Sequence, residues 1–217
     1  MIAARRPTDQ LVQSLVSDLR PVPRAAIVLR LAIGATVGAA TSVFLLMLLI
    51  GSRPDLAMVI QSTRFWSKAG YMLATAGISL LVAARLARPG SNTRLMWLLP
   101  IPLLVYLPAA ILELIRTEPT NWVPLLLGYG WQLCTWLVLI LSIPIYIGLW
   151  WAFRSFAPTR MEAAGAVTGL CASAIAGVVY CLHCPTDTAV FALTWYTLAF
   201  AIAAIVGRLL GHRLLHW

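Results

Sequence analysis

The chain is short of charged residues: Asp, Glu, Lys and Arg make up 11% of its 217 residues, whereas a typical soluble domain contains about 25%. This shortage excludes an ordinary soluble domain. Hydrophobic residues make up 61% of the sequence, and the mean hydropathy is +0.87. Composition alone therefore places the chain among membrane proteins.

The sequence also lacks the motifs of common enzyme classes: a hydrolase elbow, a P-loop, a dinucleotide fingerprint or His-Glu-x-x-His. No predicted span has a charged residue at its middle, where transport of ions or polar solutes usually requires one. The net charge of +9 favours cytoplasmic loops over nucleic-acid binding, because no basic run interleaves with aromatics outside the apolar stretches. The first 18 residues lack the apolar core of a signal peptide. We expect no enzymatic activity, no cofactor, no small-molecule substrate and no direct nucleic-acid contact.

Apolar stretches of membrane-spanning length recur along the chain. A span needs about 20 residues, so residues 122–153 are too long for one, and residues 122–129 are interpreted as an interfacial lead-in. Gly34 and Gly38 favour close helix contact, and the prolines of the third stretch predict a kink. The predicted fold class is all-α, a polytopic membrane protein with six transmembrane helices at residues 25–50, 65–82, 95–112, 130–151, 163–182 and 188–210.

Arginine and lysine are distributed unevenly between the two faces that six spans create. With the N-terminus inside, those on inner faces outnumber those on outer faces by about three to one. The positive-inside rule then predicts that both ends lie in the cytoplasm. The first outer loop opposes this trend, because Arg53, Arg64 and Lys68 outnumber Asp55 there.

Residues 1–24 form the only sizeable soluble segment, and they contain one predicted helix. Thr8 is suited to cap it with Asp9 in its first turn, and Pro21 and Pro23 end it. A helix of about three turns is not stable alone in water, so this segment needs a surface on which to dock. The apolar residues that fall on one face are Leu11, Val12, Leu15, Val16 and Leu19.

Cys134, Cys181 and Cys184 are predicted to lie at similar depth at the same outer end of the bundle. Cys134 lies about one turn into the fourth span, and Cys184 lies in the polar break that follows the fifth. Cys171 is at mid-span, where a cysteine acts as a small apolar filler. Cys181 and Cys184 form a C-x-x-C pair, whose spacing supports thiol exchange, but the βαβ pattern of thioredoxin-like proteins is missing.

The polar break also offers an imidazole and a carboxylate. His183, with Cys134 and Cys184, would supply ligands that zinc or another soft divalent ion accepts. Alternatively, His183 is an ordinary loop histidine and Asp187 is the N-cap of the sixth helix. Glu113, at the outer end of the third span, is a second candidate and is expected to pair with Arg116.

Taken together, these pieces resemble the NrsF family of membrane anti-sigma factors. The match covers nearly the whole chain, and its order and spacing are more specific than any single piece. The pieces are Thr8-Asp9-Gln10-Leu11, Asp18-Leu19-Arg20-Pro21-Val22, Arg53-Pro54-Asp55-Leu56, Phe65-Trp66 with Lys68, Arg88-Pro89-Gly90, Cys134, Leu182-His183-Cys184-Pro185, Phe191, Trp195-Tyr196, Gly207, Gly211, Arg213 and Trp217.

The resemblance implies a bacterial inner-membrane protein whose residues 1–24 hold an extracytoplasmic-function sigma factor and whose residues 25–217 form a six-helix sensor domain. It implies two functional cysteines, which map to Cys134 and Cys184, whereas Cys171 and Cys181 do not match. We expect an oxidant or a heavy metal to act at Cys134, Cys184 and His183 and so release the sigma factor. The predicted sigma-binding residues are Asp9, Leu11, Leu15, Val16, Asp18, Leu19 and Arg20.

One alternative function remains open from the residues. A membrane thiol–disulfide oxidoreductase would use Cys181 and Cys184 as its redox pair, with Cys134 as the resolving thiol. That enzyme would need a quinone or another redox partner.

Overall fold

The computed structural model describes residues 12–14, 16–17, 24–88, 93–156 and 160–214. Every regular element within these ranges is helical, and six stretches are long and apolar enough to cross a membrane. The all-α prediction with six spans is thus confirmed. The long helices are α2 (Arg24–Leu49), α4 (Thr63–Leu86), α5 (Ile101–Arg116), α7 (Trp131–Phe153), α8 (Met161–Tyr180) and α10 (Thr197–Leu214). Between them lie α3 (Leu56–Val59), η1 (Thr93–Leu98), η2 (Pro119–Asn121), α6 (Trp122–Leu127), α9 (Ala189–Phe191) and η3 (Ala192–Tyr196).

Two of the six spans are interrupted. In the third, the 3-10 turn η1 ends before Pro100, and α5 then continues past the predicted end at residue 112. The span is thus interrupted at Pro100, where the sequence predicted a kink, whereas Pro102 and Pro108 lie within α5. The sixth span begins as α9, passes through the π-helical turn η3 and continues as α10. The π turn was not predicted; such turns insert one residue into a helix and are frequent at functional sites.

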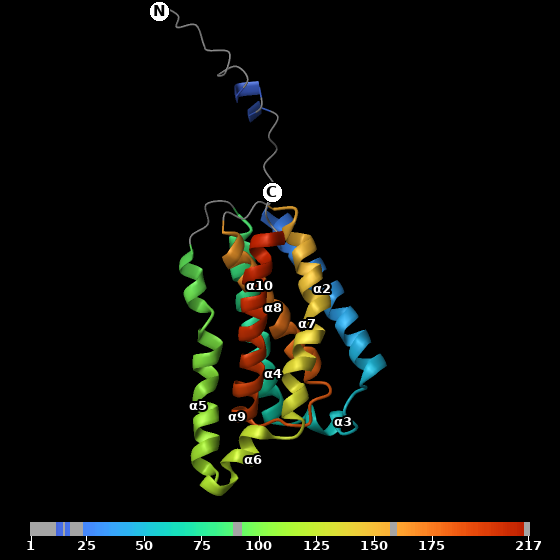
Figure 1. Ribbon diagram of the computed structural model, residues 1–217, viewed down its shortest axis with the longest axis vertical. Helices are drawn as coiled ribbons and strands as arrows, with labels where there is room; N and C mark the ends of the chain where they lie inside the picture. Colours follow the sequence, from blue (N-terminus) through green and yellow to red (C-terminus); the bar gives the residue numbers. More distant parts are fainter. Residues whose placement is uncertain (1–11, 15, 18–23, 89–92, 157–159, 215–217) are drawn as a thin grey trace, which may run out of the picture.

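Helix α8 is the centre of the bundle. Helices α4, α7 and α10 all pack against it, and Figure 1 shows α5 and α2 on the flanks of the bundle. Of the most apolar window in each span, 72% is buried in α8 but only 17% in the third span. The peripheral α5 therefore exposes most of its surface to the lipid, whereas α8 is a core helix.

Glycines allow the closest helix contacts. The backbone of Gly34 on α2 meets that of Gly148 on α7, and the backbone of Gly165 on α8 meets that of Gly207 on α10. A Cβ atom at any of these positions would overlap the carbonyl group of its partner. Gly38 likewise lies against the backbone of α7, so the predicted close contact of α2 is confirmed, with α7 as its partner.

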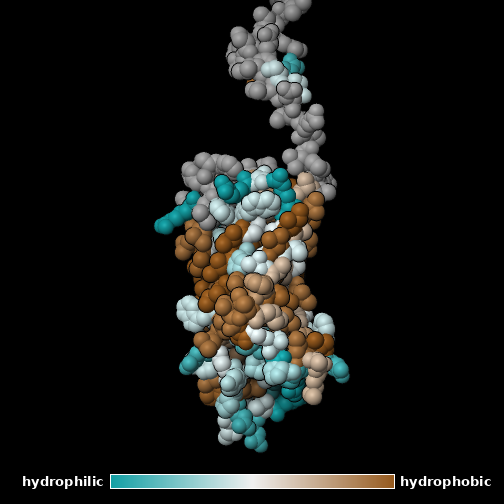
Figure 2. All heavy atoms as spheres, turned by 90° about the vertical axis from the view of Figure 1, so that its right-hand side faces the viewer, coloured by the Kyte–Doolittle hydropathy of each residue, from teal (hydrophilic) through white to brown (hydrophobic). Residues whose placement is uncertain are grey.

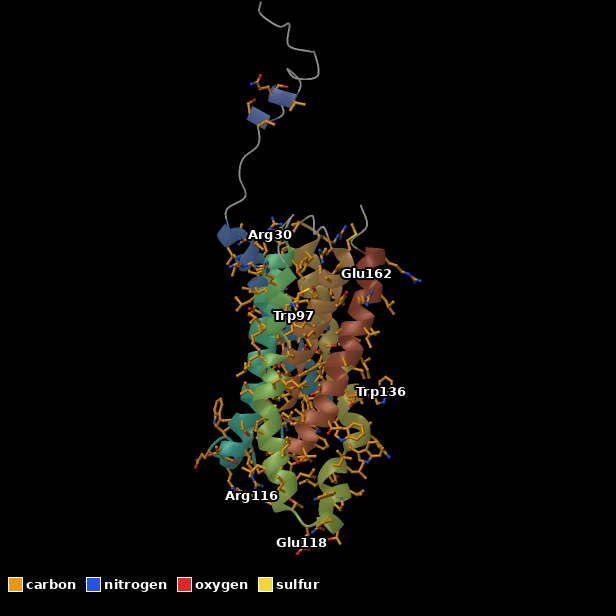
Figure 3. The ribbon with its side chains drawn as sticks, turned by 90° about the vertical axis from the view of Figure 1, so that its left-hand side faces the viewer. Arg30, Trp97, Arg116, Glu118, Trp136 and Glu162 are labelled. Atoms are coloured by element: carbon orange, nitrogen blue, oxygen red, sulfur yellow. The ribbon has the colours of Figure 1, made fainter. Side chains whose placement is uncertain are left out.

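The bundle has two polar ends and an apolar belt between them, as Figure 2 shows for one face. We call the end where α2 begins and α10 ends the tail end; Arg30 and Glu162 lie there in Figure 3. The opposite end, where α5 and α8 end and α7 begins, carries Arg116 and Glu118. We call it the thiol end, because Cys134 and the segment after α8 lie there.

The predicted docking helix lies partly within the described residues. Residues 12–14 and 16–17 are helical, and Val12 and Val16 of its apolar face are 54% and 57% exposed. The other predicted sigma-binding residues, Asp9, Leu11, Leu15, Asp18, Leu19 and Arg20, lie outside the described residues. Their role stays a prediction.

Candidate thiol site

The segment after α8 folds back over the thiol end of the bundle. The carbonyl oxygen of Tyr180, the last residue of α8, accepts hydrogen bonds from the backbone N–H groups of His183 and Cys184, both at 3.0 Å. This tight turn carries Cys184 into the bundle, where it is 1% exposed.

Cys134 reaches the same place from α7. Gly130, with a φ of 74°, precedes α7, and its carbonyl oxygen accepts a hydrogen bond from the Cys134 N–H at 3.1 Å. A positive φ of this kind favours glycine, so Gly130 sets the start of the helix. The side chains of Cys134 and Cys184 lie close enough that each influences the protonation of the other, and neither is in a disulfide. The structure thus brings together the two cysteines that the sequence placed at one end of the bundle.

A lysine that sequence reasoning assigned to the outer surface is buried beside these thiols. Lys68, in the second turn of α4, is 0% exposed. Its Nζ donates a hydrogen bond to the Thr186 carbonyl oxygen at 2.8 Å, forms an ion pair with Asp187 at 3.3 Å, and lies 5.3 Å from the centre of the Tyr196 ring. The Cys184 thiol donates to the same carbonyl oxygen of Thr186, at 3.6 Å, so the ammonium and the thiol are neighbours.

Arg53 clamps the same segment from the α2–α3 loop. Its guanidinium bonds the Asp187 carboxylate at 2.9 Å, the Cys184 carbonyl oxygen at 3.0 Å and the Asp55 carboxylate at 2.8 Å. We call Arg53, Lys68, Cys134, Cys184 and Asp187 the thiol cluster. Burying a charge is costly unless it is paired, and here Asp187 pairs with both cations.

The pairing of Arg53 and Lys68 with Asp187 explains why the first outer loop carries an excess of positive residues, against the positive-inside rule. Arg53 and Lys68 are not free surface charges, because both are buried and hold carboxylates. The interpretation of Lys68 as an interfacial charge was wrong. Asp187 is also not the N-cap of the sixth helix: that position is Thr188, and the Asp187 carboxylate is engaged by the two cations.

The pKa values of Cys184 and Cys181 are shifted in opposite directions. The neighbouring Cys134 and the positive charge of Lys68 lower the pKa of Cys184, and burial opposes them. Burial raises the pKa of Cys181 to about 12, and its sulfur lies 3.4 Å from the Met72 sulfur on α4. Because thiolates are the reactive form, these opposite directions favour Cys184 over Cys181 as the reactive thiol.

His183 is directed elsewhere. Its Nδ1 lies 3.0 Å from the Gly51 carbonyl oxygen, at the end of α2. Within the described ranges, no three side chains of His, Cys, Asp or Glu converge in a way that would hold a metal ion. The structure therefore brings Cys134 and Cys184 together without His183 as a third ligand.

Glu113 also has a different partner from the one expected. Its carboxylate accepts a hydrogen bond from the Val190 N–H at 3.0 Å, instead of forming an ion pair with Arg116. Glu113 thus ties α5 to the start of the sixth span.

Sequence reasoning missed the roles of Arg53, Lys68 and Tyr196. One signal was present: Lys68 falls inside an apolar stretch, where an unpaired ammonium is costly, so a buried partner was required. Tyr196 is fully buried, and its ring lies 5.3 Å from the Lys68 Nζ. It is the last residue of the π turn η3, which no sequence pattern indicated.

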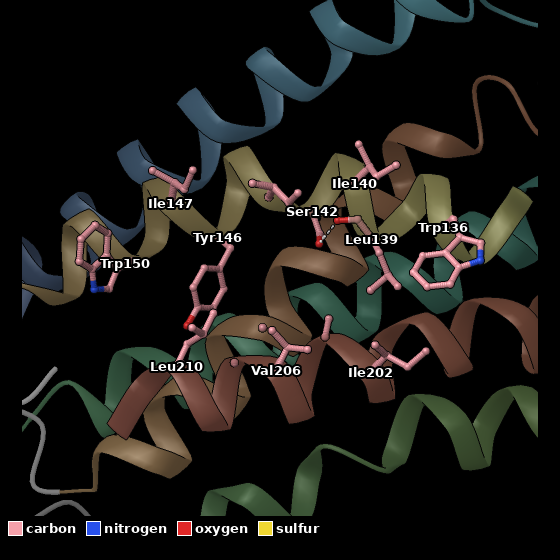
Figure 4. Close-up of a pocket in the computed structure, with 14 residues that line it drawn as sticks. Trp136, Leu139, Ile140, Ser142, Tyr146, Ile147, Trp150, Ile202, Val206 and Leu210 are labelled. Atoms are coloured by element: carbon pink, nitrogen blue, oxygen red, sulfur yellow. Dashed lines mark hydrogen bonds between the residues drawn. The ribbon is translucent and has the colours of Figure 1, made fainter. Parts of the chain in front are cut away.

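Apart from the thiol cluster, the bundle has an apolar groove. Figure 4 shows a groove of about 590 Å³ between α7 and α10, bordered by Trp136, Tyr146 and Val206 among others. None of its lining residues carries a carboxylate, thiol, imidazole, amine or guanidinium. Its Ser142 hydroxyl donates to the Leu139 carbonyl oxygen at 2.6 Å. The groove lacks reactive groups, so the thiol cluster is the candidate functional site.

The fold and the site define a class: a helical protein with six segments long and apolar enough to span a membrane and a buried pair of thiols at one end. The family described as NrsF, negative regulator of sigma F, matches residues 15–217. The chain belongs to this family, as its resemblance indicated. It is 36% identical to "Probable anti-sigma-F factor NrsF" of Azospira oryzae over 213 residues, or 97% of this chain and 99% of that protein. It is 35% identical to "Anti-sigma-F factor NrsF" of Caulobacter vibrioides over 217 residues, with the same coverage. No solved structure matches it.

Proposed function

We propose that this protein is an inner-membrane anti-sigma factor that holds a sigma factor of the extracytoplasmic-function type through its tail and releases it when the thiol cluster is modified. Family membership supports the regulatory, non-enzymatic role. The observation that carries the thiol signal is that Cys134 and Cys184 are buried as close neighbours at the end opposite the start of α2. The arginines Arg30, Arg85, Arg154 and Arg208 lie at or near the tail end, which favours placing that end in the cytoplasm.

The tail would bind as an amphipathic helix in a groove of the sigma factor. Val12 and Val16 are exposed and so are available for such a contact. The remaining apolar positions, Leu11, Leu15 and Leu19, complete the same face by sequence spacing, with Asp9, Asp18 and Arg20 at its polar edge. Occupation of that groove would keep the sigma factor from RNA polymerase.

The thiol pair is arranged for two-electron oxidation. The Cys184 thiolate attacks a peroxide oxygen, the O–O bond breaks, and Cys184 becomes a sulfenic acid while hydroxide leaves and takes up a proton. The Cys134 sulfur then attacks the Cys184 sulfur, a disulfide forms, and the sulfenic oxygen leaves as water. Two thiols and one peroxide thus give one disulfide and two waters. A thiophilic metal ion would bridge the same two sulfurs and displace their protons.

A path for the signal leads from the thiols into α2. The segment that carries Cys184 is bonded to the loop at the end of α2: the Arg53 N–H donates to the Leu182 carbonyl oxygen at 3.0 Å, and the Arg53 side chain holds Asp187. Disulfide formation brings the two sulfurs to about 2.05 Å and so displaces this segment. Helix α2 then leads directly to the tail.

Helix α2 is suited to move as a rigid body with α7. Gly34 and Gly38 give it backbone contact with α7, and its buried Ser42 hydroxyl donates to the Leu141 carbonyl oxygen of α7 at 2.7 Å. A tenfold loss of sigma affinity requires only about 1.4 kcal/mol of differential binding between the two states.

The test is co-purification of the sigma factor with the membrane protein before and after peroxide. Cys134→Ser and Cys184→Ser should retain the sigma factor under oxidant, whereas wild type should lose it. Cys171→Ser, a buried cysteine outside the cluster, is the matched control and should behave as wild type. If both cluster variants release the sigma factor like wild type, the thiol signal is wrong. If no sigma factor co-purifies with reduced wild type, sequestration itself is wrong.

The oxidoreductase alternative finds no support in the geometry. It requires Cys181 as the partner of Cys184, but the Cys181 thiol donates to the Met72 sulfur, and the thiol that most influences Cys184 is Cys134.

A further inference from the structure

A polar pocket of about 470 Å³ lies beside the thiol cluster. The first turns of α4, the last turns of α5 and residues 187–189 form its walls, at the end of the bundle where Figure 3 places Arg116. The pocket shares Asp187 with the thiol cluster. Its other polar lining residues, which the proposed thiol chemistry does not use, are Arg64, Ser67, Glu113, Arg116, Thr117 and Thr188.

The positive groups of this pocket are free while its negative groups are engaged. Asp187 lies between Arg53 and Lys68, and Glu113 accepts a hydrogen bond from the Val190 N–H. The guanidinium groups of Arg64 and Arg116 make no ion pair or hydrogen bond with any residue that the structure describes. Two partner-free guanidinium groups at one pocket favour an anionic ligand.

A hydroxyl group in the same pocket also lacks a partner. The Oγ1 atom of Thr188 is buried and makes no hydrogen bond. Leaving a buried polar group unpaired is costly, so a ligand that accepts a hydrogen bond from it would be stabilised. By contrast, the hydroxyl groups of Ser67 and Thr117 already donate to backbone carbonyl oxygens within their own helices or at their ends.

We propose that this pocket binds a phosphate group. Arg64 and Arg116 would hold its oxygens, because the guanidinium fork matches phosphate, and Thr188 would donate the third contact. The pocket falls in the range of small-molecule sites, about 300–1,000 Å³, so the phosphate belongs to a larger group than a bare ion. The pocket lies at the start of α4 and the end of α5. The group that carries the phosphate is therefore either a phospholipid headgroup or a soluble phosphate ester.

Occupation of this pocket would regulate the thiol cluster, an effect that rests on the proposed function. Thr188 directly follows Asp187, so a bound phosphate would restrain the segment that carries Cys184. We therefore expect slower modification of Cys184 when the pocket is filled.

The binding test uses the purified full-length protein without sigma factor, so its outcome is independent of sequestration. Arg64→Gln/Arg116→Gln is compared with Arg30→Gln/Arg213→Gln, which removes the same two charges at the tail end. Calorimetry with glycerol 3-phosphate in phospholipid-free detergent probes the soluble source. Native mass spectrometry after extraction from vesicles of phosphatidylglycerol and phosphatidylcholine probes the headgroup source.

Wild type and the tail-end double variant should bind at least one probe alike, and the pocket double variant should bind it at least about tenfold more weakly. Thr188→Val, which keeps the side-chain shape, should weaken binding about three- to tenfold. If the pocket double variant does not fold, binding by Thr188→Val becomes the test of the phosphate site. Equal binding by all variants, or no binding of either probe to wild type, overturns the proposal.

Discussion

The two ends of the bundle use their charges in opposite ways. At the thiol end, Arg53 and Lys68 are buried and hold Asp187 between them. At the tail end, the ion pair of Arg208 with Glu162 is exposed, with side-chain exposures of 65% and 51%. Exposed pairs contribute about 0–1 kcal/mol, whereas breaking a buried pair costs several. The difference indicates that the charges at the thiol end fix the geometry of a buried site, whereas the pair at the tail end contributes little to the fold.

The largest effect should come from Asp187→Asn, which removes the carboxylate shared by two buried cations. The neutral amide leaves Lys68 without its ion pair, so we expect a loss of about 3 kcal/mol in unfolding free energy. Thermal unfolding in detergent measures it. A loss below about 1 kcal/mol would show that the two ends do not differ as described.

The next effect separates the tail from the thiol end. Val16→Asp places a charge on the apolar face of the docking helix, and we expect at least about tenfold weaker sigma binding, measured by co-purification. Ser17→Ala, on the same helix and also exposed, is the control. Peroxide should still form the Cys134–Cys184 disulfide in both variants; a changed rate would contradict the separation of output from sensor.

Lys68→Met tests the electrostatic part of the thiol cluster. Removing the ammonium should raise the pKa of Cys184, because its positive charge helps to lower that pKa. At pH 7 a smaller fraction would be thiolate, so alkylation of Cys184 should slow by about tenfold for each pH unit by which its pKa exceeds 7. Alkylation followed by mass spectrometry from pH 5 to 9 measures this.

In the same experiment Lys68→Arg, which keeps the positive charge, should stay close to wild type. The difference between wild type and Lys68→Met should disappear above pH 9, where both forms are deprotonated. An unchanged pH profile in Lys68→Met would refute the role of the ammonium.

The smallest effect belongs to the exposed pair of the tail end. Glu162→Gln should change the unfolding free energy by less than about 1 kcal/mol, and raising the salt concentration should abolish even that difference. A larger loss, measured beside Asp187→Asn, would remove the contrast between the two ends.

Sequence patterns predicted the spans well because span length is a local property. The boundaries of α2, α7 and α8 fall within a few residues of the predicted ones, and Cys134 and Cys184 were placed at one end simply by counting spans. The π turn η3 was missed because an inserted residue shifts the phase of a helix, and this shift leaves no visible mark in a stretch that is apolar almost throughout. The partners of Glu113 and Asp187 were also missed, because both are set by how α5, α4 and the α2–α3 loop meet the segment after α8.

The sequence by itself determined six stretches long and apolar enough to cross a membrane, an apolar face predicted by spacing in residues 11–19, and the placement of two cysteines at the same end. These properties follow from composition and periodicity within single segments. Only the tertiary structure decided that Arg53 and Lys68 are internal charges, because the carboxylate that pairs with them lies 134 and 119 residues further along the chain. Whether a charge faces lipid headgroups or the interior depends on which helices pack around it, and that information is spread over the whole bundle.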